Sequence, residues 1–225
     1  MKRLPSCGGG LVVLHSQPPR ESLVINGDTA ARLPRAFFAE AAPDVARALL
    51  GHRLMRRLPD GRLLGGRIVE TEGYHGLQDS ASHGRSGPTG RAAVMFGEAG
   101  RAYVYLIYGM YDMLNISTAE TGMPSAVLIR AIEPLIGEAV MRELRPVKGV
   151  ALSNGPGKLC RAMQITRALN NEDLIGSDQL WLAAGEAVAA HEVSATPRIG
   201  IDYAAPECRD RPWRFIINGN KWVSR

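Results

Sequence analysis

One short span of this 225-residue chain holds a carboxylate, a histidine and several tyrosines that could act together on a flat ring. Glu72 can accept a proton or orient a water molecule, as a general base does. Aromatic rings stack on flat heterocycles, and an imidazole can hydrogen-bond to their edge. The residues that follow Glu72 supply these groups as Tyr74, His83, Tyr103, Tyr105, Tyr108 and Tyr111. The set fits chemistry on a base taken out of a duplex.

Glu70 and Glu72 are two residues apart in a segment with strand character, so both carboxylates should lie on the same side of the strand. A pair of this kind usually marks a solvated strand face, because charged side chains are mostly exposed. A metal site made by both glutamates with Asp79 and His83 is a second alternative, although these residues lack a compact ligand spacing. The strand is expected to end at Gly73. This places Glu72 beside the following loop and favours it over Glu70 as the reactive group.

The tyrosines between 103 and 111 flank a tight turn at Gly109-Met110. They could simply be sheet residues, since tyrosine favours strands. Tyr103 and Tyr105 share one strand face, and Tyr108 is expected on the other face at the tip of the hairpin. A ring beside a hairpin turn cannot bury well in its own sheet, so Tyr108 should protrude. A protruding ring suits a wedge in the minor groove of DNA.

Two polar residues interrupt apolar strands. Asn115 lies in the run Met113-Leu114-Asn115-Ile116, where a buried amide without a partner costs about 1–3 kcal/mol. It could be a structural residue with satisfied hydrogen bonds. Arg130 lies within the apolar run 126–132, and a buried arginine needs an acidic partner. Glu72 is the candidate for that partner.

The elements that position these residues are mostly strands. A helix is expected over 43–51, with proline in its first turn and glycine at its end, and further helices over 137–144 and 157–165. Residues 73–100 contain seven glycines and little periodicity, which is typical of a functional loop. Strands are expected at 52–58 and 63–71 around Pro59-Asp60-Gly61, at 102–108 and 111–118, at 126–132 as a central strand, and near 180–182, 199–201 and 213–217.

Hairpins of this kind are incompatible with a regular βαβ series. We therefore expect a single compact α+β domain over 31–225, built around a curved, mostly antiparallel mixed sheet with flanking helices and a protruding β-hairpin. Residues 1–30 read as a flexible N-terminal tail, because they mix glycine, proline and polar residues without periodicity. Within this tail, Leu23-Val24-Ile25 could add a short edge strand.

The positive net charge of the chain is compatible with binding to a polyanion. The net charge is +5 and the pI is about 9.4, although solvated basic faces are also common in other proteins. The three cysteines form no Cys-x-x-Cys pair, so neither a zinc site nor a disulfide framework is expected, and the protein should be reduced and intracellular. No apolar stretch is long enough for a signal peptide or a membrane span.

From about Arg32 onward the chain resembles the alkyladenine (3-methyladenine) DNA glycosylase family. The resemblance rests on Glu70-Thr71-Glu72-Gly73-Tyr74, where Gly73 replaces the usual alanine and loosens the backbone, and on Asp79-x-x-x-His83. It rests further on the tyrosine hairpin and on the segment 153–160, which has Asn154 as an insertion. A glycine-rich turn that opens a helix and carries a lysine is an ordinary phosphate cradle.

The resemblance implies a role for each site residue. Glu72 would activate water against C1′, helped by Arg130 and the main-chain carbonyl of Ile199. Tyr74 and Tyr105 would stack on the extruded base. The remaining roles are donation to the base by His83, screening of the purine 2-position by Asn115, intercalation by Tyr108, and phosphate contacts by Arg91, Met110, Tyr111 and Lys158.

These expectations describe a monomeric, monofunctional DNA glycosylase that acts on double-stranded DNA containing damaged purines and needs no cofactor or metal. It would be intracellular and associated with DNA. The lesion could be 3-methyladenine, 7-methylguanine, hypoxanthine or ethenoadenine. Two alternatives stay open: a metal-dependent nuclease that uses Glu70, Glu72 and Asp79, and a DNA-binding module without catalytic activity.

Overall fold

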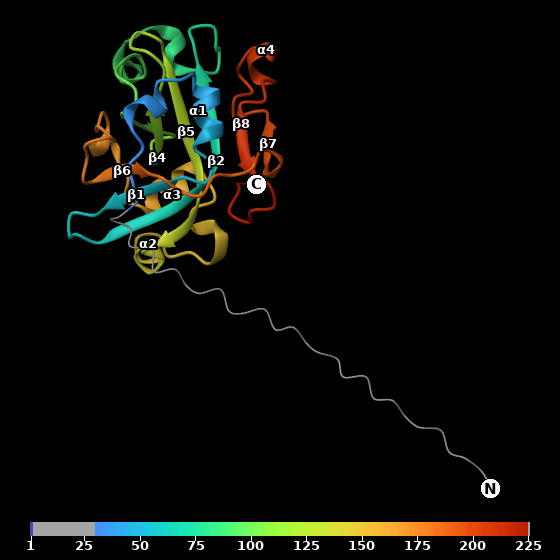
Figure 1. Cartoon of the computed structure of the whole chain (residues 1–225). Helices are drawn as coiled ribbons and strands as arrows, with labels where there is room; N and C mark the ends of the chain where they lie inside the picture. The colour runs from blue at the N-terminus through green and yellow to red at the C-terminus, as the bar shows by residue number, and fades with distance from the viewer. Residues whose placement is uncertain (2–29, 225) are drawn as a thin grey trace.

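The computed structural model describes Met1 and residues 30–224. Its strands form one eight-stranded sheet in the order β3-β4-β5-β2-β1-β6, with β8 beside β2 and β7 beside β8 (Figure 1). Every strand pair in the described residues is antiparallel. The strands are β1 Arg53–Arg57, β2 Leu63–His75, β3 Ala102–Ile107, β4 Tyr111–Ser117, β5 Ser125–Ile136, β6 Leu180–Ala183, β7 Val193–Thr196 and β8 Arg214–Ile217.

The helices are short and lie between the strands in the sequence. The α-helices are α1 Ala42–Ala48, α2 Glu138–Leu144, α3 Pro156–Ala162 and α4 Pro206–Arg209. Segments of 3-10 helix are η1 Arg35–Phe38, η2 His83–Ser86, η3 Gly90–Phe96, η4 Gly149–Leu152, η5 Arg167–Leu169 and η6 Ala190–Glu192. The predicted single α+β domain is thereby confirmed. The expected tail and the expected strand at Leu23-Val24-Ile25 lie outside the described residues, apart from Met1 and Ala30.

The long strand β2 organises the sheet around the two glutamates. Its first half pairs with β1, up to Arg67 opposite Arg53, and its second half pairs with β8, from Glu70 opposite Ile216. The sheet therefore forks along one edge of β2, and the register against β5 on the other edge shifts on both sides of Glu70. Such bulges aim side chains locally and are common next to active sites.

Several element boundaries differ from the prediction, and three of them concern segments that carry predicted site residues. β2 continues through Gly73 to His75 because β5 pairs with it over the whole length, so Glu72 lies inside the strand and not at its end. Residues 199–201 are a bend without ladder pairing, and β7 precedes them instead. Helix α3 ends at Ala162, three residues earlier than expected.

Gly73 permits a close approach between β2 and α1. A Cβ atom at Gly73 would lie 2.9 Å from the backbone nitrogen of Pro43 in the first turn of α1. The side chain of Thr71 faces the same helix, because its Oγ1 donates to the carbonyl of Ala46 at 2.7 Å. Glycine at this position therefore does more than loosen the backbone. Since strand side chains alternate, Glu70 and Glu72 point away from α1.

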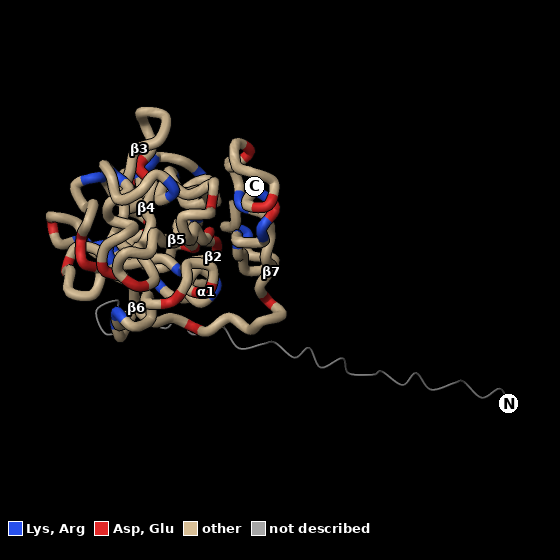
Figure 2. Tube along the Cα trace, turned by 90° about the horizontal axis from the view of Figure 1, so that it is seen from above, with Lys and Arg blue, Asp and Glu red and all other residues tan. Residues whose placement is uncertain are grey.

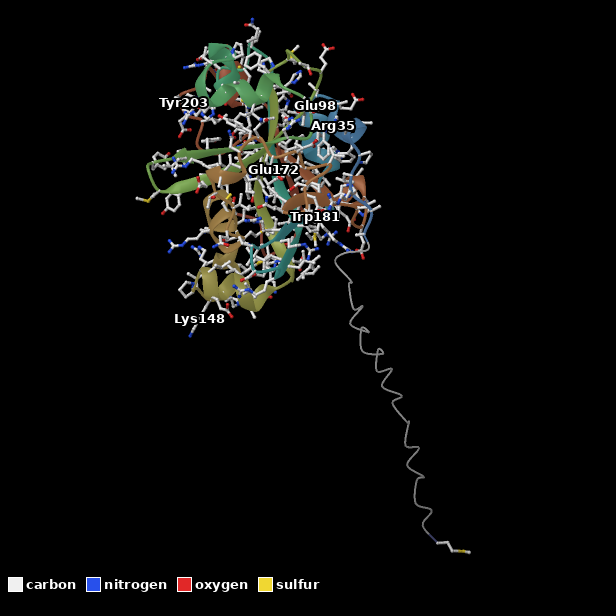
Figure 3. The ribbon with its side chains drawn as sticks, turned by 90° about the vertical axis from the view of Figure 1, so that its left-hand side faces the viewer. Arg35, Glu98, Lys148, Glu172, Trp181 and Tyr203 are labelled. Carbon is white, nitrogen blue, oxygen red and sulfur yellow. The ribbon has the colours of Figure 1, made fainter. Side chains whose placement is uncertain are left out.

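The hairpin of β3 and β4 projects from the body of the protein, as Figure 3 shows at its left edge. Tyr108 and Gly109 have φ angles of 51° and 70°, and the amide of Met110 donates to the carbonyl of Ile107 at 3.2 Å. Positive φ at both central residues is the pattern of a type I′ turn, which matches the twist of paired strands. The predicted tight hairpin is confirmed, with its central turn residues at Tyr108-Gly109, one position earlier than the expected Gly109-Met110.

Basic and acidic residues alternate along the chain trace, so the excess positive charge is not confined to one segment (Figure 2). In the part of the chain that the structure describes, no helix combines the length and the apolar character that a membrane span requires.

Candidate active site

An aromatic cavity of about 380 Å³ opens beside the hairpin, with walls from β2, β3, β4, β5 and the bend at 199–201. Most of its lining is apolar or aromatic, which suits a flat ligand. Seven of the predicted site residues line it, and Glu72 lies directly behind its wall. These lining residues are Tyr74, His83, Tyr105, Tyr108, Asn115, Arg130 and Ile199, together with Tyr103 from the same tyrosine cluster.

Glu72 is completely buried and accepts hydrogen bonds at both oxygens. Its Oε2 accepts the hydroxyl of Tyr74 at 2.8 Å, and its Oε1 accepts the main-chain amide of Ile199 at 2.7 Å. The Nη1 of Arg130 lies 3.2 Å from Oε1. A carboxylate has about four acceptor positions, so these three donors do not use all of them. The solvated strand face considered from the sequence is wrong for both glutamates.

Arg130 connects the two glutamates of β2. Its Nε donates to Glu70 Oε1 at 2.8 Å, which is closer than its contact with Glu72. Glu70 is also fully buried and accepts from the Nε of Arg214 at 2.7 Å and from the amide and hydroxyl of Ser224. Burial alone would raise the pKa of Glu70, but Arg130 and the other donors outweigh it and lower the pKa. The predicted pairing of Arg130 with Glu72 is confirmed, and Glu70 holds the same guanidinium.

His83 and its neighbours form another part of the cavity wall. Its Nδ1 lies 2.9 Å from the hydroxyl of Tyr103, and the guanidinium of Arg91 lies 3.4 Å from its Nε2. Arginine only donates, so Nε2 accepts and Nδ1 carries the proton. Burial and the adjacent Arg91 lower the pKa of His83 to about 4, so the ring is neutral at physiological pH. This His is half-buried in the cavity wall and is not an ordinary solvated loop residue.

The tyrosine rings differ in orientation. Tyr105 meets the His83 ring edge-on at a centroid distance of 4.7 Å, and Arg91 covers it at 5.3 Å. Burial raises the pKa of Tyr105 to about 12. Tyr74 directs its hydroxyl to Glu72 and packs its ring at 4.7 Å from the guanidinium of Arg198. Both rings are cavity walls.

Asn115 is buried in β4 opposite Tyr103 of β3. Its amide nitrogen donates to the carbonyl of Tyr103 at 3.2 Å. The residue thus has a structural hydrogen bond and also lines the cavity.

The hairpin tip is exposed and apolar. Tyr108 is 80% exposed, Met110 67% and Tyr111 43%. Tyr111 packs against the start of α3, where a Cβ at Gly157 would lie 3.0 Å from its side chain. Lys158 follows on that helix and donates to the side chain of Asn154 at 2.9 Å. The four predicted phosphate-contacting residues therefore fall into two groups, with Met110, Tyr111 and Lys158 near α3 and Arg91 beside His83 and Tyr105.

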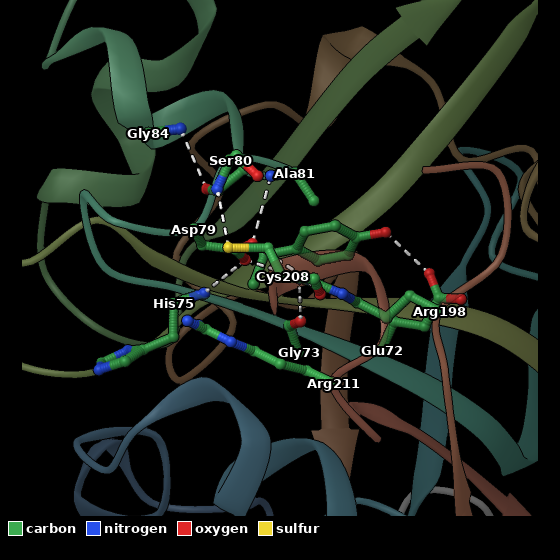
Figure 4. A network of polar contacts seen from close by, with 12 residues as sticks. Glu72, Gly73, His75, Asp79, Ser80, Ala81, Gly84, Arg198, Cys208 and Arg211 are labelled. Atoms are coloured by element: carbon green, nitrogen blue, oxygen red, sulfur yellow. Dashed lines mark hydrogen bonds and ion pairs between the residues drawn. The ribbon is translucent and has the colours of Figure 1, made fainter. Parts of the chain in front are cut away.

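A buried Asp79–Arg198 pair was not predicted from the sequence. Arg198 Nη1 lies 2.6 Å from Asp79 Oδ2, its Nη2 lies 2.8 Å from Oδ1, and both side chains are fully buried (Figure 4). The sequence suggested Asp79 as a possible metal ligand and as part of the Asp79-x-x-x-His83 motif, but not as the partner of an arginine. In the structure, arginines pair with all three acids, Glu70, Glu72 and Asp79. No sequence pattern links Asp79 to Arg198. The pair could have been suspected only on the general ground that charged residues are rarely buried without a partner.

Tyr203 is a second residue that the sequence did not single out. It is 65% exposed at the cavity mouth, and its hydroxyl donates to the carbonyl of Ala81 at 2.9 Å. The ring also borders a second, more polar cavity of about 430 Å³ whose lining includes Arg85 and Arg91. In Figure 3 it lies toward the same side of the protein as the hairpin.

Comparison with known proteins agrees with this geometry. The sequence profile of the methylpurine-DNA glycosylase family matches residues 36–221. The chain is 51% identical over 195 residues to the putative 3-methyladenine DNA glycosylase of Methanocella arvoryzae, which covers 86% of this chain and 96% of that protein. It is 43% identical over 205 residues to the DNA-3-methyladenine glycosylase of Homo sapiens, which covers 86% of this chain and 68% of that protein. The chain therefore belongs to the methylpurine-DNA glycosylase family, whose enzymes hydrolyse N-glycosyl bonds.

Proposed function

We propose that this protein excises damaged purines from double-stranded DNA by hydrolysing the bond between the base and C1′ of the sugar. The observation that carries the proposal is the placement of the Glu72 carboxylate directly behind an aromatic cavity of about 380 Å³. A base inside a duplex cannot reach such a site, so the nucleotide must be extruded. Alkylated purines, such as 3-methyladenine and 7-methylguanine, and hypoxanthine or ethenoadenine are the substrates that we propose.

Glu72 takes the role of general base. Its carboxylate, oriented by the three donors around it, can accept a proton from water. Arg130 lies beside Glu72 and helps to hold that water. The carbonyl of Ile199 is proposed as a further water contact. Water attacks C1′, its proton passes to Glu72, and the electrons of the glycosidic bond leave with the purine.

The cavity walls bind the extruded base. Tyr74 and Tyr105 offer ring surfaces, the main chain or ring of His83 contacts the base edge, and the buried amide of Asn115 screens the 2-position. Damaged pairs open at lower cost than intact ones, and a positively charged alkylated base leaves easily. Selectivity therefore comes from the lesion as well as from the cavity.

The exposed hairpin and the basic groups hold the duplex. Tyr108 fills the gap that the extruded nucleotide leaves, as apolar wedges do in other minor-groove proteins. Met110, Tyr111, Lys158 and Arg91 contact the sugar-phosphate backbone. None of the described residues that line the cavity is a lysine. The expected product is an abasic site in an uncut strand.

A base-release assay on duplexes that each carry one lesion tests the proposal. We expect free purine and an abasic site under multiple turnover, with no loss of activity in the presence of a chelator. Strand cleavage that a chelator abolishes would identify a nuclease. Binding of lesion duplex without release of any base would identify a binding module.

A further inference from the structure

Arg198 is held by more contacts than any other guanidinium near the cavity. Besides the two contacts with Asp79, its Nη1 donates to the carbonyl of Gly73 and its Nη2 to the carbonyl of Cys208, both at 2.9 Å. Its charge also lies 4.7 Å from the ring centre of Tyr74 and 5.1 Å from that of Trp213. The side chain thus joins β2, the loop that follows it and α4 (Figure 4).

The next residue carries the amide that donates to the proposed catalytic base. Ile199 N lies 2.7 Å from Glu72 Oε1, although the two residues are 127 positions apart. Ile199 is 40% exposed and lies outside the strand ladders, so neither strand pairing nor packing of its own side chain fixes the direction of its amide. The chain then turns at Gly200, whose φ is 75°, before the buried Ile201. The anchored side chain of Arg198 is the nearest element that can fix the direction of the Ile199 amide.

Stability alone does not explain this pair. A buried ion pair can often be replaced by apolar residues without loss of stability, because both charges must be desolvated. The Nε of Arg198 is also buried without a hydrogen-bond partner, which is unfavourable for a polar group. A buried charged pair that adds no stability can be retained because it fixes the orientation of a neighbouring group.

We propose that Asp79 and Arg198 are positioning residues that hold the Ile199 amide on Glu72 and thereby keep the carboxylate correctly oriented. The proposal rests on the proposed function for the role of Glu72. It assigns no contact with substrate to either residue. Asp79 acts through Arg198, and Arg198 acts through the main chain of its neighbour.

The first test replaces Arg198 by lysine. Arg198→Lys keeps the charge and a single contact with Asp79, but one ammonium group cannot also reach the carbonyls of Gly73 and Cys208. The matched control is Arg35→Lys. Arg35 also bridges an aspartate and a carbonyl, Asp173 and Ala99, and lies on the side of the protein away from the hairpin (Figure 3).

Three measurements test whether Arg198 positions the Ile199 amide or only supports the fold. Amide hydrogen exchange at Ile199, followed in isoleucine-labelled protein, should speed up in Arg198→Lys and stay unchanged in Arg35→Lys. The single-turnover excision rate should fall at least about tenfold in Arg198→Lys, the order expected when one aligned donor is lost from a catalytic group. The dissociation constant for lesion duplex should change by less than about threefold, because the base walls remain. Unchanged protection of Ile199 together with an unchanged excision rate would overturn the proposal, and so would a rate loss with full protection.

A second variant tests the amide directly. Ile199→Pro removes the donor and leaves Arg198 and Asp79 in place, so it should reproduce the rate loss of Arg198→Lys. An excision rate equal to that of the wild type would overturn the proposal. If Arg198→Lys does not fold, the isosteric variant Asp79→Asn takes its place with the same expected outcomes. Absence of base release from the wild-type protein would instead contradict the proposed function, while the exchange measurement would still test the anchoring of the amide.

Discussion

The guanidinium of Arg130 links the two carboxylates of β2, with its Nε 2.8 Å from Glu70 and its Nη1 3.2 Å from Glu72. The two glutamates differ in their remaining partners. Glu70 accepts from Arg214 and Ser224, whereas Glu72 accepts from Tyr74 and Ile199, which both line the cavity. One carboxylate therefore belongs to the scaffold and the other to the cavity wall.

Glu72→Gln should abolish base excision and leave binding of lesion duplex nearly intact. The amide has a similar shape, but it cannot accept a proton from water. The single-turnover excision rate and the dissociation constant for lesion duplex check this prediction together. Excision at a rate close to that of the wild type would remove Glu72 from the role of general base.

Glu70→Gln should mainly lower the stability of the fold and retain substantially more excision activity than Glu72→Gln. Breaking a buried ion pair costs about 3–5 kcal/mol, because it leaves the arginine charge uncompensated. The folded-state pKa of Glu70 lies below its ordinary value, so its contribution to stability is present above that value and is lost as the pH falls. Urea unfolding at neutral and acidic pH should therefore show the largest difference between wild type and variant at neutral pH. A variant as stable as the wild type there would contradict this assignment.

Local patterns and the family resemblance predicted most of the elements and most of the polar and aromatic residues that line the cavity. The alternation around Gly109-Met110 predicted the hairpin and the exposure of Tyr108, and the charge in an apolar run predicted that Arg130 would need an acid. Burial of Glu72 was less predictable, because strand residues with carboxylates are usually solvated.

The contacts that complete the site join segments too far apart in sequence to predict. Ile199 reaches Glu72 over 127 positions, and Arg198 reaches Asp79 over 119. The two isoleucines at 199 and 201 suggested a strand, but the positive φ of Gly200 turns the chain. The amide of Ile199 then donates to a carboxylate and not to a neighbouring strand. Tertiary contacts override local propensity at this bend.

His83 should make the protein less stable as the pH falls. Burial and Arg91 lower its pKa from 6.5 to about 4, so between these values the unfolded chain binds a proton that the folded protein does not. Stability should therefore decrease as the pH falls through this window, and His83→Gln should weaken the decrease. Burial also lowers the pKa of His52 and His75, so the comparison of variant with wild type isolates His83. Parallel curves of unfolding free energy against pH would contradict the prediction.

Salt should weaken DNA binding in proportion to the phosphates contacted. Each contact contributes a slope of about −0.9 to a plot of log affinity against log salt concentration. Arg91→Ala and Lys158→Ala should each reduce the slope by about that amount. Arg47→Ala, an exposed change on α1 that borders none of the cavities described above, should leave the slope unchanged. A wild-type slope near zero would argue against duplex DNA as the partner.

Tyr108→Ser should slow excision most where the lesion pair is hardest to open. The ring is 80% exposed at the hairpin tip, so its proposed place is the gap left by the extruded nucleotide. Filling that gap offsets part of the few kcal/mol that unstacking costs. The loss in single-turnover rate should therefore be largest for hypoxanthine or ethenoadenine in a stable pair and smaller in a mismatch. Tyr105→Ser should slow excision whatever the opposing base, because its proposed contact is with the extruded purine.

Tyr108→Gly separates the loss of the proposed wedge from any loss of folding stability. Tyr108 has a φ of 51°, a conformation that costs a non-glycine residue about 1 kcal/mol or more and that glycine adopts freely. This variant should match or exceed the wild type in thermal stability and still lose excision activity with the same dependence on the opposing base. If the excision rate of both Tyr108 variants falls by the same factor whatever the opposing base, Tyr108 is not a wedge and its ring only packs on the surface. A loss of activity in Tyr108→Gly therefore could not be ascribed to an unfolded hairpin, and it would have to come from the missing ring.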